Sequence, residues 1–286
     1  MIWFWLKNSR IFSLPMAILS WLVIFVYALK NGGNIINGIT ALIGISFAQL
    51  ATNLFDDYMD YKNLPPNSQQ AKCAYIKDGK ATLKDVLKVV ILYLSISTLT
   101  GLFLLIRCGI PVIGLALIGG IIALLYSKMS QRGFSELAVG ITFGPLLFEG
   151  VYFVMTKNFS LEVLVMSIAV VMFTIGLMYT HTVLDFEGDI CSHKKTLVCR
   201  LGSKTKAING IFFVYGLGYL FTLILAYIMK NPDILATFVL VPLVFNLKNS
   251  LKSFECGGEE KEFYVRLLKA RNLMVFYSLI LTLALV

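Results

Sequence analysis

Two pairs of aspartates have a spacing that suits metal chemistry, and each pair directly follows a long apolar segment. The first pair is Asp56 and Asp60, and the second is Asp185 and Asp189. Residues four apart on a helix share one face, with their Cβ atoms about 5–6 Å apart. Asn53, three residues before Asp56, joins the first face. Charged groups beside a membrane-spanning segment are costly and therefore indicate a functional site.

The four carboxylates are expected to serve one site. The same number of residues separates Asp56 from Asp185 and Asp60 from Asp189, as a repeated helical unit with a functional loop after its second helix would produce. Carboxylates held together raise one another's pKa, and a divalent cation between them removes this cost. Hard oxygen ligands suit Mg²⁺, which completes its shell with water and with substrate phosphate oxygens. We therefore predict that all four aspartates are metal ligands.

The elements that must position these residues are transmembrane helices. Hydrophobic residues make up 58% of the 286 residues, charged residues only 14%, and the mean hydropathy is +0.80, which excludes an ordinary soluble domain. A helix needs about 20 apolar residues to cross a bilayer, and these segments are too long and too uniformly apolar for barrel strands. We predict nine spans, at 11–30, 34–54, 86–106, 109–127, 135–156, 161–184, 207–229, 232–248 and 270–286.

The distribution of basic residues predicts the orientation of these spans. If residues 1–10 lie in the cytoplasm, nearly all of the 25 Lys and Arg residues fall on the cytoplasmic side. The exceptions are Lys30, Arg107, Lys157 and Lys230. This asymmetry is the positive-inside rule, so the net charge of +9 needs no nucleic acid to explain it. Both aspartate pairs are then expected at the cytoplasmic face.

On these residues the chain resembles a known family. The N-x-x-D-x-x-x-D and D-x-x-x-D sequences, on a chain with nine predicted helices, resemble the UbiA superfamily of intramembrane prenyltransferases. The stretch DFEGDICSHKKTLVCRLG (185–202) and the stretch GFSELAVGITFGPLL within 126–147 are most similar to the menaquinone-pathway branch, the 1,4-dihydroxy-2-naphthoate polyprenyltransferases. That branch usually has Gly at the position of His193 and often Arg at the position of Leu184.

The resemblance implies a fold and a reaction. The fold is an all-α polytopic membrane protein, with nine transmembrane helices in a pseudo-twofold bundle around a central cavity. Residues 1–286 form one domain, with repeated halves at about 11–130 and 135–286. The reaction is the Mg²⁺-dependent transfer of a polyprenyl group from a polyprenyl diphosphate to 1,4-dihydroxy-2-naphthoate, at the cytoplasmic face of a bacterial or archaeal plasma membrane. Prenylation of 4-hydroxybenzoate or another quinone precursor is the alternative.

The resemblance also implies roles for residues near the aspartates. Tyr126, at the end of the fourth predicted helix, resembles a family tyrosine that contacts Asp185, which makes it a candidate catalytic residue with the four aspartates. The alternative for Tyr126 is a tyrosine of the membrane interface. The candidates for binding the diphosphate are Asn53, Lys72, Lys77, Lys128, Lys194 and Lys195. His193 and Glu149 receive no role.

A membrane transporter is the alternative from another functional class. A transporter usually needs ionisable groups and broken helices near the middle of the bilayer, whereas this chain keeps its acids at one face. The five cysteines are scattered without a C-x-x-C pair, so they predict neither a disulfide nor a metal site. An enzyme is therefore favoured. Its expected partners are a polyprenyl diphosphate, a small aromatic acceptor and the bilayer, with no nucleic acid and no protein partner.

Overall fold

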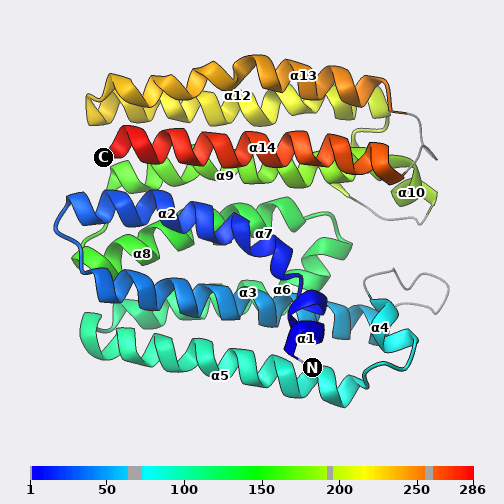
Figure 1. Ribbon diagram of the computed structural model, residues 1–286, viewed down its shortest axis with the longest axis horizontal. Helices are drawn as coiled ribbons and strands as arrows, with labels where there is room; N and C mark the ends of the chain where they lie inside the picture. The colour runs from blue at the N-terminus through cyan, green and yellow to red at the C-terminus, as the bar shows by residue number, and fades with distance from the viewer. Residues whose placement is uncertain (1, 64–72, 192–195, 255–259) are drawn as a thin grey trace.

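A computed structural model of the chain describes residues 2–63, 73–191, 196–254 and 260–286, and within these ranges it contains helices and turns but no strand. Nine helical segments of the described chain are long and apolar enough to cross a membrane. The predicted all-α, nine-span architecture is therefore confirmed for these residues. The long helices lie side by side along the longest axis of the molecule (Figure 1).

The spans and the short helices between them have the following bounds. The spans are η1 with α2 (Ile11–Ser13 and Leu14–Lys30), α3 (Ile35–Asn63), α5 (Leu83–Cys108), α6 (Pro111–Gln131), α7 with η4 and α8 (Ser135–Ile141, Thr142–Leu146 and Leu147–Thr156), α9 (Leu161–Leu184), α12 (Lys204–Met229), η5 with α13 (Pro232–Leu240 and Val241–Lys252), and α14 (Glu260–Leu285). The short helices are α1 (Ile2–Asn8), α4 (Ala74–Lys77), α10 (Phe186–Cys191) and α11 (Leu197–Arg200).

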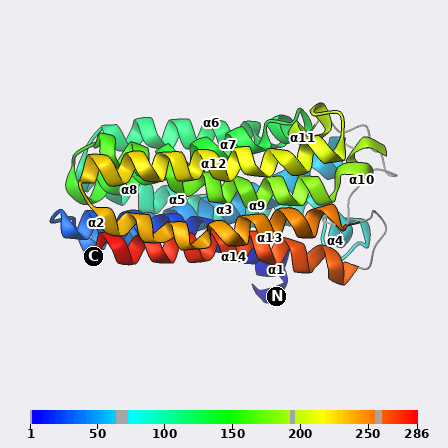
Figure 2. The ribbon, with the colours of Figure 1, turned by 90° about the horizontal axis from the view of Figure 1, so that it is seen from above.

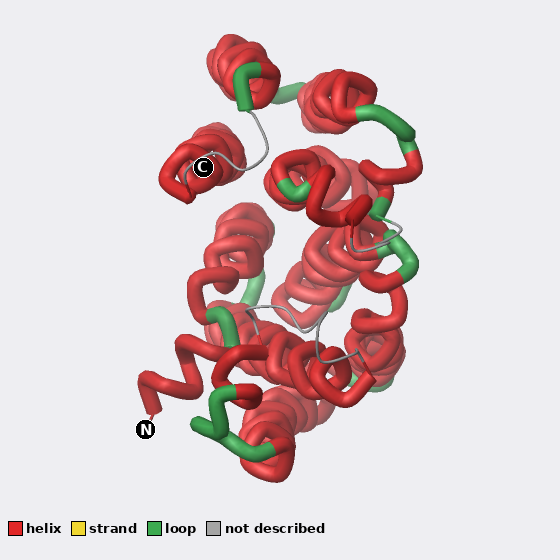
Figure 3. The backbone as a smooth tube through the Cα atoms, turned by 90° about the vertical axis from the view of Figure 1, so that its right-hand side faces the viewer, coloured by secondary structure: helices red, strands yellow, loops and turns green. Residues whose placement is uncertain are grey.

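Packing between the long helices builds the bundle around α3 and α9. The helix α3 packs along α5, and α9 packs along α12, while α14 lies against both α9 and α2. From above, α4, α10 and α11 gather at one end of the bundle (Figure 2). Figure 3 looks onto that end and shows the long helices end-on. The two helices that lead into the aspartate motifs are therefore held by extensive helix–helix contacts.

Two predicted helix boundaries differ from the structure by more than four residues. The helix α3 continues through the first motif to Asn63, and α14 begins at Glu260 rather than at 270. Both extensions carry charged residues, which a hydropathy pattern assigns to loops. In α14 the buried Arg266 is accommodated because its Nε donates to the Ser250 carbonyl oxygen at 2.6 Å. Charged side chains with such partners are compatible with a packed helix.

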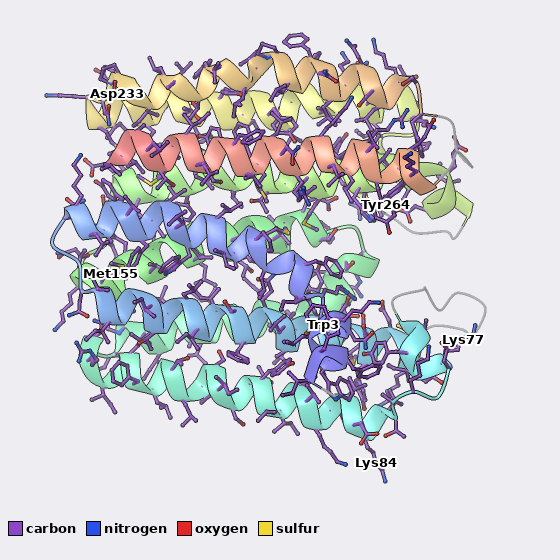
Figure 4. The ribbon with its side chains drawn as sticks, in the orientation of Figure 1. Trp3, Lys77, Lys84, Met155, Asp233 and Tyr264 are labelled. Atoms are coloured by element: carbon purple, nitrogen blue, oxygen red, sulfur yellow. The ribbon has the colours of Figure 1, made fainter. Side chains whose placement is uncertain are left out.

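Both aspartate motifs lie at the same end of the bundle. The helices α3 and α9 end there, beside α4 and α10 (Figure 1). We call this the motif end; it comprises residues 56–63, 73–82, 185–191 and 196–203. In Figure 4, Lys77 and Lys84 lie at this end, while Met155 and Asp233 lie at the opposite end. The structure thus brings together two motifs that are far apart in the sequence.

We expect the two ends of the bundle to be accessible from opposite sides of the membrane. Lys77→Cys and Lys252→Cys, made in a chain without its native cysteines, should react with an impermeant maleimide only in inside-out vesicles. Lys157→Cys and Asp233→Cys should react in intact cells, because all four side chains are exposed, at opposite ends. Labelling of Lys77→Cys and Asp233→Cys from the same side would contradict this topology.

Candidate active site

The first aspartate pair lies on the last turns of α3. This helix is continuous from Ile35 to Asn63, so Asp56 and Asp60 share one face, as expected from their spacing. Both side chains are buried, with 5% of each residue exposed, and the neighbouring Asp57 is fully buried. Carboxylates in such a setting require partners, because burial without a partner strongly disfavours the ionised form.

The second aspartate pair spans a break between two helices. The helix α9 ends at Leu184, Asp185 caps it with φ −85° and ψ 4°, and α10 begins at Phe186. The backbone N–H of Asp185 donates to the His181 carbonyl oxygen at 3.0 Å, and the Asp185 carbonyl oxygen accepts from the N–H of Asp189 at 2.8 Å, so Asp185 joins the two helices. The end of α9 at Leu184 agrees with the predicted span 161–184, and the residues after it form the short helix α10. Asp189 is buried, whereas the Asp185 side chain is 42% exposed.

The first motif contains a cation whose role the sequence pattern did not reveal. Nη2 of Arg10 contacts the Asp57 carboxylate and lies 3.5 Å from Oδ2 of Asp56. Arg10 lies just before η1 with φ 59° and ψ 51°, in the left-handed region that residues other than glycine rarely adopt. Such backbone strain persists only where the surroundings fix it. Here the ion pair and the contacts of the N-terminal turn do so.

This N-terminal turn is held by polar side chains of α3. Nδ2 of Asn53 donates to the Ser9 carbonyl oxygen at 3.0 Å and to Oγ of Ser13 at 3.2 Å. Nε2 of Gln49 donates to the carbonyl oxygen and Oγ of Ser13, at 3.1 and 3.0 Å. Gln49, Asn53 and Asp57 follow one another at intervals of four, so they form one polar stripe. The amide nitrogen of Asn53 thus binds the turn, and its contact with a diphosphate stays a prediction.

The charges of Arg10 and Asp57 also affect the pKa values of side chains at the first motif. Burial opposes the charge of Arg10, but the carboxylates of Asp57 and Asp56 outweigh burial and raise the pKa of the guanidinium above its ordinary value. The Tyr126 phenol adds to this effect. Burial and the nearby Asp57 carboxylate also raise the pKa of the Tyr75 phenol. Arg10 is therefore charged and Tyr75 neutral throughout the physiological pH range.

A second basic residue offsets the additional acid of the second motif. Glu187 lies between the two aspartates, and its Oε1 is 3.3 Å from Nζ of Lys204 at the start of α12. Nζ of Lys204 also donates to the Phe254 carbonyl oxygen at 3.0 Å, after α13. Each motif thus contains one acid outside the D-x-x-x-D pattern, and that acid pairs with a cation from another segment. The pairs are Asp57 with Arg10 and Glu187 with Lys204. The aspartates of the two D-x-x-x-D pairs are the candidate ligands, and Asp56 among them also lies 3.5 Å from Arg10.

His181 is a candidate site residue that the sequence pattern missed. Its Nδ1 lies 3.1 Å from Oδ2 of Asp185, one helical turn further along α9, and its ring stands edge-on to that of Phe263 on α14. His181 continues the spacing of the second motif as H-x-x-x-D-x-x-x-D, which is the signal that identifies it. His193, to which the sequence gave no role, lies outside the described residues.

The other predicted site residues have different surroundings. Tyr126, on α6, is close enough to Arg10 to act on its pKa, and the neighbouring Ser127 places Oγ 3.5 Å from Oδ1 of Asp60. The contact of Tyr126 with Asp185 stays a prediction. Among the predicted lysines, Lys77 and Lys128 are exposed, and Figure 4 shows Lys77 at the outer edge of the motif end. The remaining candidates lie outside the described residues: Lys72, Lys194 and Lys195.

Glu149, which received no role from the sequence, lies away from both motifs. Its Oε2 accepts a hydrogen bond at 3.3 Å from the backbone N–H of Ser160, at the start of α9. The first N–H groups of a helix have no partner within the helix and need such acceptors. Glu149 therefore supports the end of α9 that is opposite to the motif end.

The donor set at the motif end fits Mg²⁺ bound together with a phosphate ligand. Across the described ranges, no group of at least three His, Cys, Asp or Glu side chains forms a ready-made metal cluster. Mg²⁺ does not require one, because it is commonly bound through one or two carboxylates plus water and substrate phosphates. The buried oxygens of Asp56, Asp60 and Asp189 and the half-exposed carboxylate of Asp185 supply hard ligands of this kind.

Comparisons with known proteins relate the chain to one family. A sequence model of the UbiA prenyltransferase family matches residues 14–255. The 1,4-dihydroxy-2-naphthoate octaprenyltransferase of Bacillus subtilis (strain 168) is 24% identical over 169 residues, which cover 57% of this chain and 54% of that protein. The match therefore spans about half the length of this curated relative.

Solved structures share the fold at low sequence identity. A UbiA homologue from Aeropyrum pernix K1 superposes with a TM-score of 0.69 at 16% identity, covering 94% of this chain and 96% of the other. A UbiA homologue from Archaeoglobus fulgidus bound to GPP and Mg²⁺ gives a TM-score of 0.63 at 12% identity, covering 97% and 99%. The likeness extends over nearly the whole length of each chain.

The ion pair of Arg10 and Asp57 predicts a non-additive effect on stability. Arg10→Met leaves a fully buried carboxylate without its cation and should lower the free energy of unfolding by about 3–5 kcal/mol. The double variant Arg10→Met/Asp57→Leu should recover most of this loss, because an apolar pair replaces the ion pair. Thermal unfolding of purified protein in detergent measures both effects.

A matched control is the exposed pair of Lys80 and Asp78, whose charged atoms are 3.2 Å apart. The corresponding variants Lys80→Met, Asp78→Leu and their combination should each change stability by less than about 1 kcal/mol, as is usual for surface pairs. A double variant at Arg10 and Asp57 that loses the sum of the two single losses would show that the pair does not act as a unit.

Proposed function

Because the chain belongs to the UbiA prenyltransferase family, we propose that this prenyltransferase moves a polyprenyl group from a polyprenyl diphosphate to 1,4-dihydroxy-2-naphthoate. The observation that carries the proposal is the meeting of two D-x-x-x-D pairs at one end of a nine-span apolar bundle. The family assignment favours an enzyme over the transporter alternative. The named relative from Bacillus subtilis supports this acceptor.

The polarity of the donor matches the polarity of the motif end. A polyprenyl diphosphate has a hydrocarbon tail and a multiply charged head, so its binding surface must change from apolar to ionic over a short distance. The helix α3 makes this change between Leu54, which is fully buried among apolar side chains, and Asp56. The homologue from Archaeoglobus fulgidus that binds GPP and Mg²⁺ supports a donor of this class.

In the proposed reaction the aspartates hold the head of the donor and the bundle holds its tail. Asp56, Asp60, Asp185 and Asp189 would hold Mg²⁺, which would supply positive charge to the diphosphate that leaves with the electron pair of the broken allylic C–O bond. The apolar side chains of the bundle around the tail would keep water from the allylic cation, which would otherwise be hydrolysed. A ring carbon of the acceptor then forms the new C–C bond, and the ring becomes aromatic again by losing its proton or its carboxyl group.

We place the motif end at the cytoplasmic face of a bacterial or archaeal plasma membrane. The asymmetric distribution of lysine and arginine supports this orientation. A cytoplasmic site also suits the substrates, because a charged diphosphate and a charged aromatic acid do not cross a bilayer unaided.

The proposed activity is tested with purified enzyme in detergent or nanodiscs. The assay combines a polyprenyl diphosphate, 1,4-dihydroxy-2-naphthoate and Mg²⁺, and mass spectrometry identifies the extracted lipid product. 4-Hydroxybenzoate is offered in parallel as the alternative acceptor. A prenylated naphthoquinol that forms only with Mg²⁺ present is the expected result, and product formation from 4-hydroxybenzoate alone would overturn the proposed acceptor.

Asp60→Asn and Asp189→Asn should each lower kcat by several orders of magnitude, about 4 kcal/mol or more at 1.36 kcal/mol per tenfold. The double variant should be scarcely worse than either single variant, because residues that act as one unit are non-additive in kinetics. Asp78→Asn, an exposed aspartate at the same end of the bundle, is the matched control and should keep its activity. Additive losses with unchanged Mg²⁺ dependence would mean that the two motifs do not form one site.

A further inference from the structure

A pocket lies beside the helices α12 and α13 at the motif end. These two helices form one edge of the bundle (Figure 1), where the protein meets lipid. The volume of the pocket is about 430 Å³, within the range of about 300–1,000 Å³ that is usual for small-ligand sites. Its lining comes from α10, α12 and the C-terminal region of α13, and it includes Glu187, Lys204, Thr205, Asn209, Lys252 and Phe254.

The pocket lies at the depth of the membrane surface. One apolar span begins at Lys204 and the next span ends at Lys252, so both lysines stand at the boundary between the bilayer and water. Lysines at such a boundary keep their hydrocarbon stems along apolar surface and their charges at the level of the lipid headgroups. A phospholipid headgroup is therefore the ligand that this pocket meets at the highest local concentration.

Lys204 is held in place before a ligand binds. Its Nζ lies 3.3 Å from Oε1 of Glu187 and donates to the Phe254 carbonyl oxygen at 3.0 Å. The same Nζ lies 5.5 Å from the centre of the Phe254 ring, within the range of a cation–π contact. An ammonium group has three N–H donors, so these two acceptors leave one donor for a ligand. A lysine that is already ordered loses little side-chain entropy when an anion binds.

The other polar groups of the pocket also favour an anion. Lys252 brings a second ammonium group, and Thr205 and Asn209 bring a hydroxyl and an amide that can donate hydrogen bonds. Glu187 brings one opposing charge, so the lining residues together carry a net positive charge. Charge-assisted hydrogen bonds to phosphate oxygens are among the strong ones. The chemistry of the lining therefore suits a phosphate group.

An aromatic surface next to the pocket suits an acyl chain. Phe212 follows Asn209 on α12, one turn further into the span, and its ring packs against that of Phe245 on α13 with the centroids 4.9 Å apart. Phe245 is exposed, and Nζ of Lys248 lies 3.9 Å from the centre of the Phe212 ring. A third cation and an apolar surface thus continue from the pocket toward the membrane interior. A lipid uses this surface, whereas a free phosphate ion does not.

We propose that this pocket binds the headgroup phosphate of an anionic phospholipid, with Lys204 and Lys252 as its cations and with Phe212 and Phe245 against the acyl chains. The site goes beyond the transfer reaction proposed above, and lipid binding makes and breaks no covalent bond. It adjoins the second aspartate motif, because the Glu187 that contacts Lys204 belongs to that motif. A lipid that binds only the folded protein also stabilises it.

Native mass spectrometry of the purified full-length protein in a neutral detergent tests lipid binding. The protein is titrated with phosphatidylglycerol and, in parallel, with phosphatidylcholine of the same acyl chains. One phosphatidylglycerol molecule should bind roughly tenfold or more tightly than phosphatidylcholine, because two lysines contribute to its binding. Equal affinity for the two lipids would overturn the proposal, since the lysines would then not recognise the charge of the headgroup.

Substitutions in the pocket locate the bound lipid. Lys204→Gln and Lys252→Gln should each weaken phosphatidylglycerol binding roughly fivefold, the effect of about one lysine at an anionic surface, and roughly 25-fold together. Glu187→Gln should tighten binding roughly two- to fivefold, because it removes the opposing charge of the lining. A gain of this kind does not arise from damage to the fold. Lys84→Gln, an exposed lysine at the same end of the bundle (Figure 4), is the matched control and should change binding less than about twofold.

Two results with these variants and with soluble anions would contradict the proposal. Equal losses in Lys84→Gln and Lys252→Gln would mean that the whole basic surface attracts the lipid. Inorganic phosphate or diphosphate that displaces phosphatidylglycerol at a similar concentration would mean that the pocket binds a soluble anion. Thermal unfolding without added lipid checks that each variant is folded. Lys252→Gln, which changes an exposed side chain, decides the test if Lys204→Gln does not fold.

Discussion

The carboxylates at the end of α3 lie beside the apolar part of the bundle because a guanidinium lies among them. An ionised carboxylate that is removed from water needs an opposite charge or several hydrogen-bond donors. Arg10 supplies the charge to Asp57 and Asp56 together. Its position depends on the N-terminal turn, and the turn in turn depends on Gln49 and Asn53 of the same helix. The candidate metal site, the turn and α3 therefore support one another.

Both motifs supply carboxylates to the candidate metal site, but the helices that hold these carboxylates differ. The first lies on a continuous helix and has a buried cation, whereas the second spans the break between α9 and α10 and has the half-exposed pair of His181 and Asp185. A continuous helix fixes the spacing of two carboxylates firmly. In the proposed site the aspartates of both motifs hold the head of one donor, so the two different supports serve one function.

The sequence predicted the parts of the site that depend on local spacing. Nine apolar segments and the four-residue interval of Asp56 and Asp60 follow from helical periodicity and bilayer thickness, and both agree with the structure. Arg10 was not predicted, because its contact with Asp57 joins residues far apart in the chain and because a basic residue before a first span has a simpler explanation in topology. The end of α9 at Leu184 was predicted, but the short helix α10 was assigned to a loop, because its acidic residues interrupt the apolar pattern.

The contacts of the N-terminal helix α1 determine which end of the chain is better suited to a tag or a surface linkage. Phe4 and Trp5 of α1 stand edge-on to Tyr75, which itself lies beside Asp57. A fusion tag or a surface linkage at the amino end is therefore attached close to the first motif. The carboxyl end of α14 lies at the opposite end of the bundle (Figure 1). Immobilising the enzyme through that end leaves the motif end facing free solution and keeps α1 seated on the first motif.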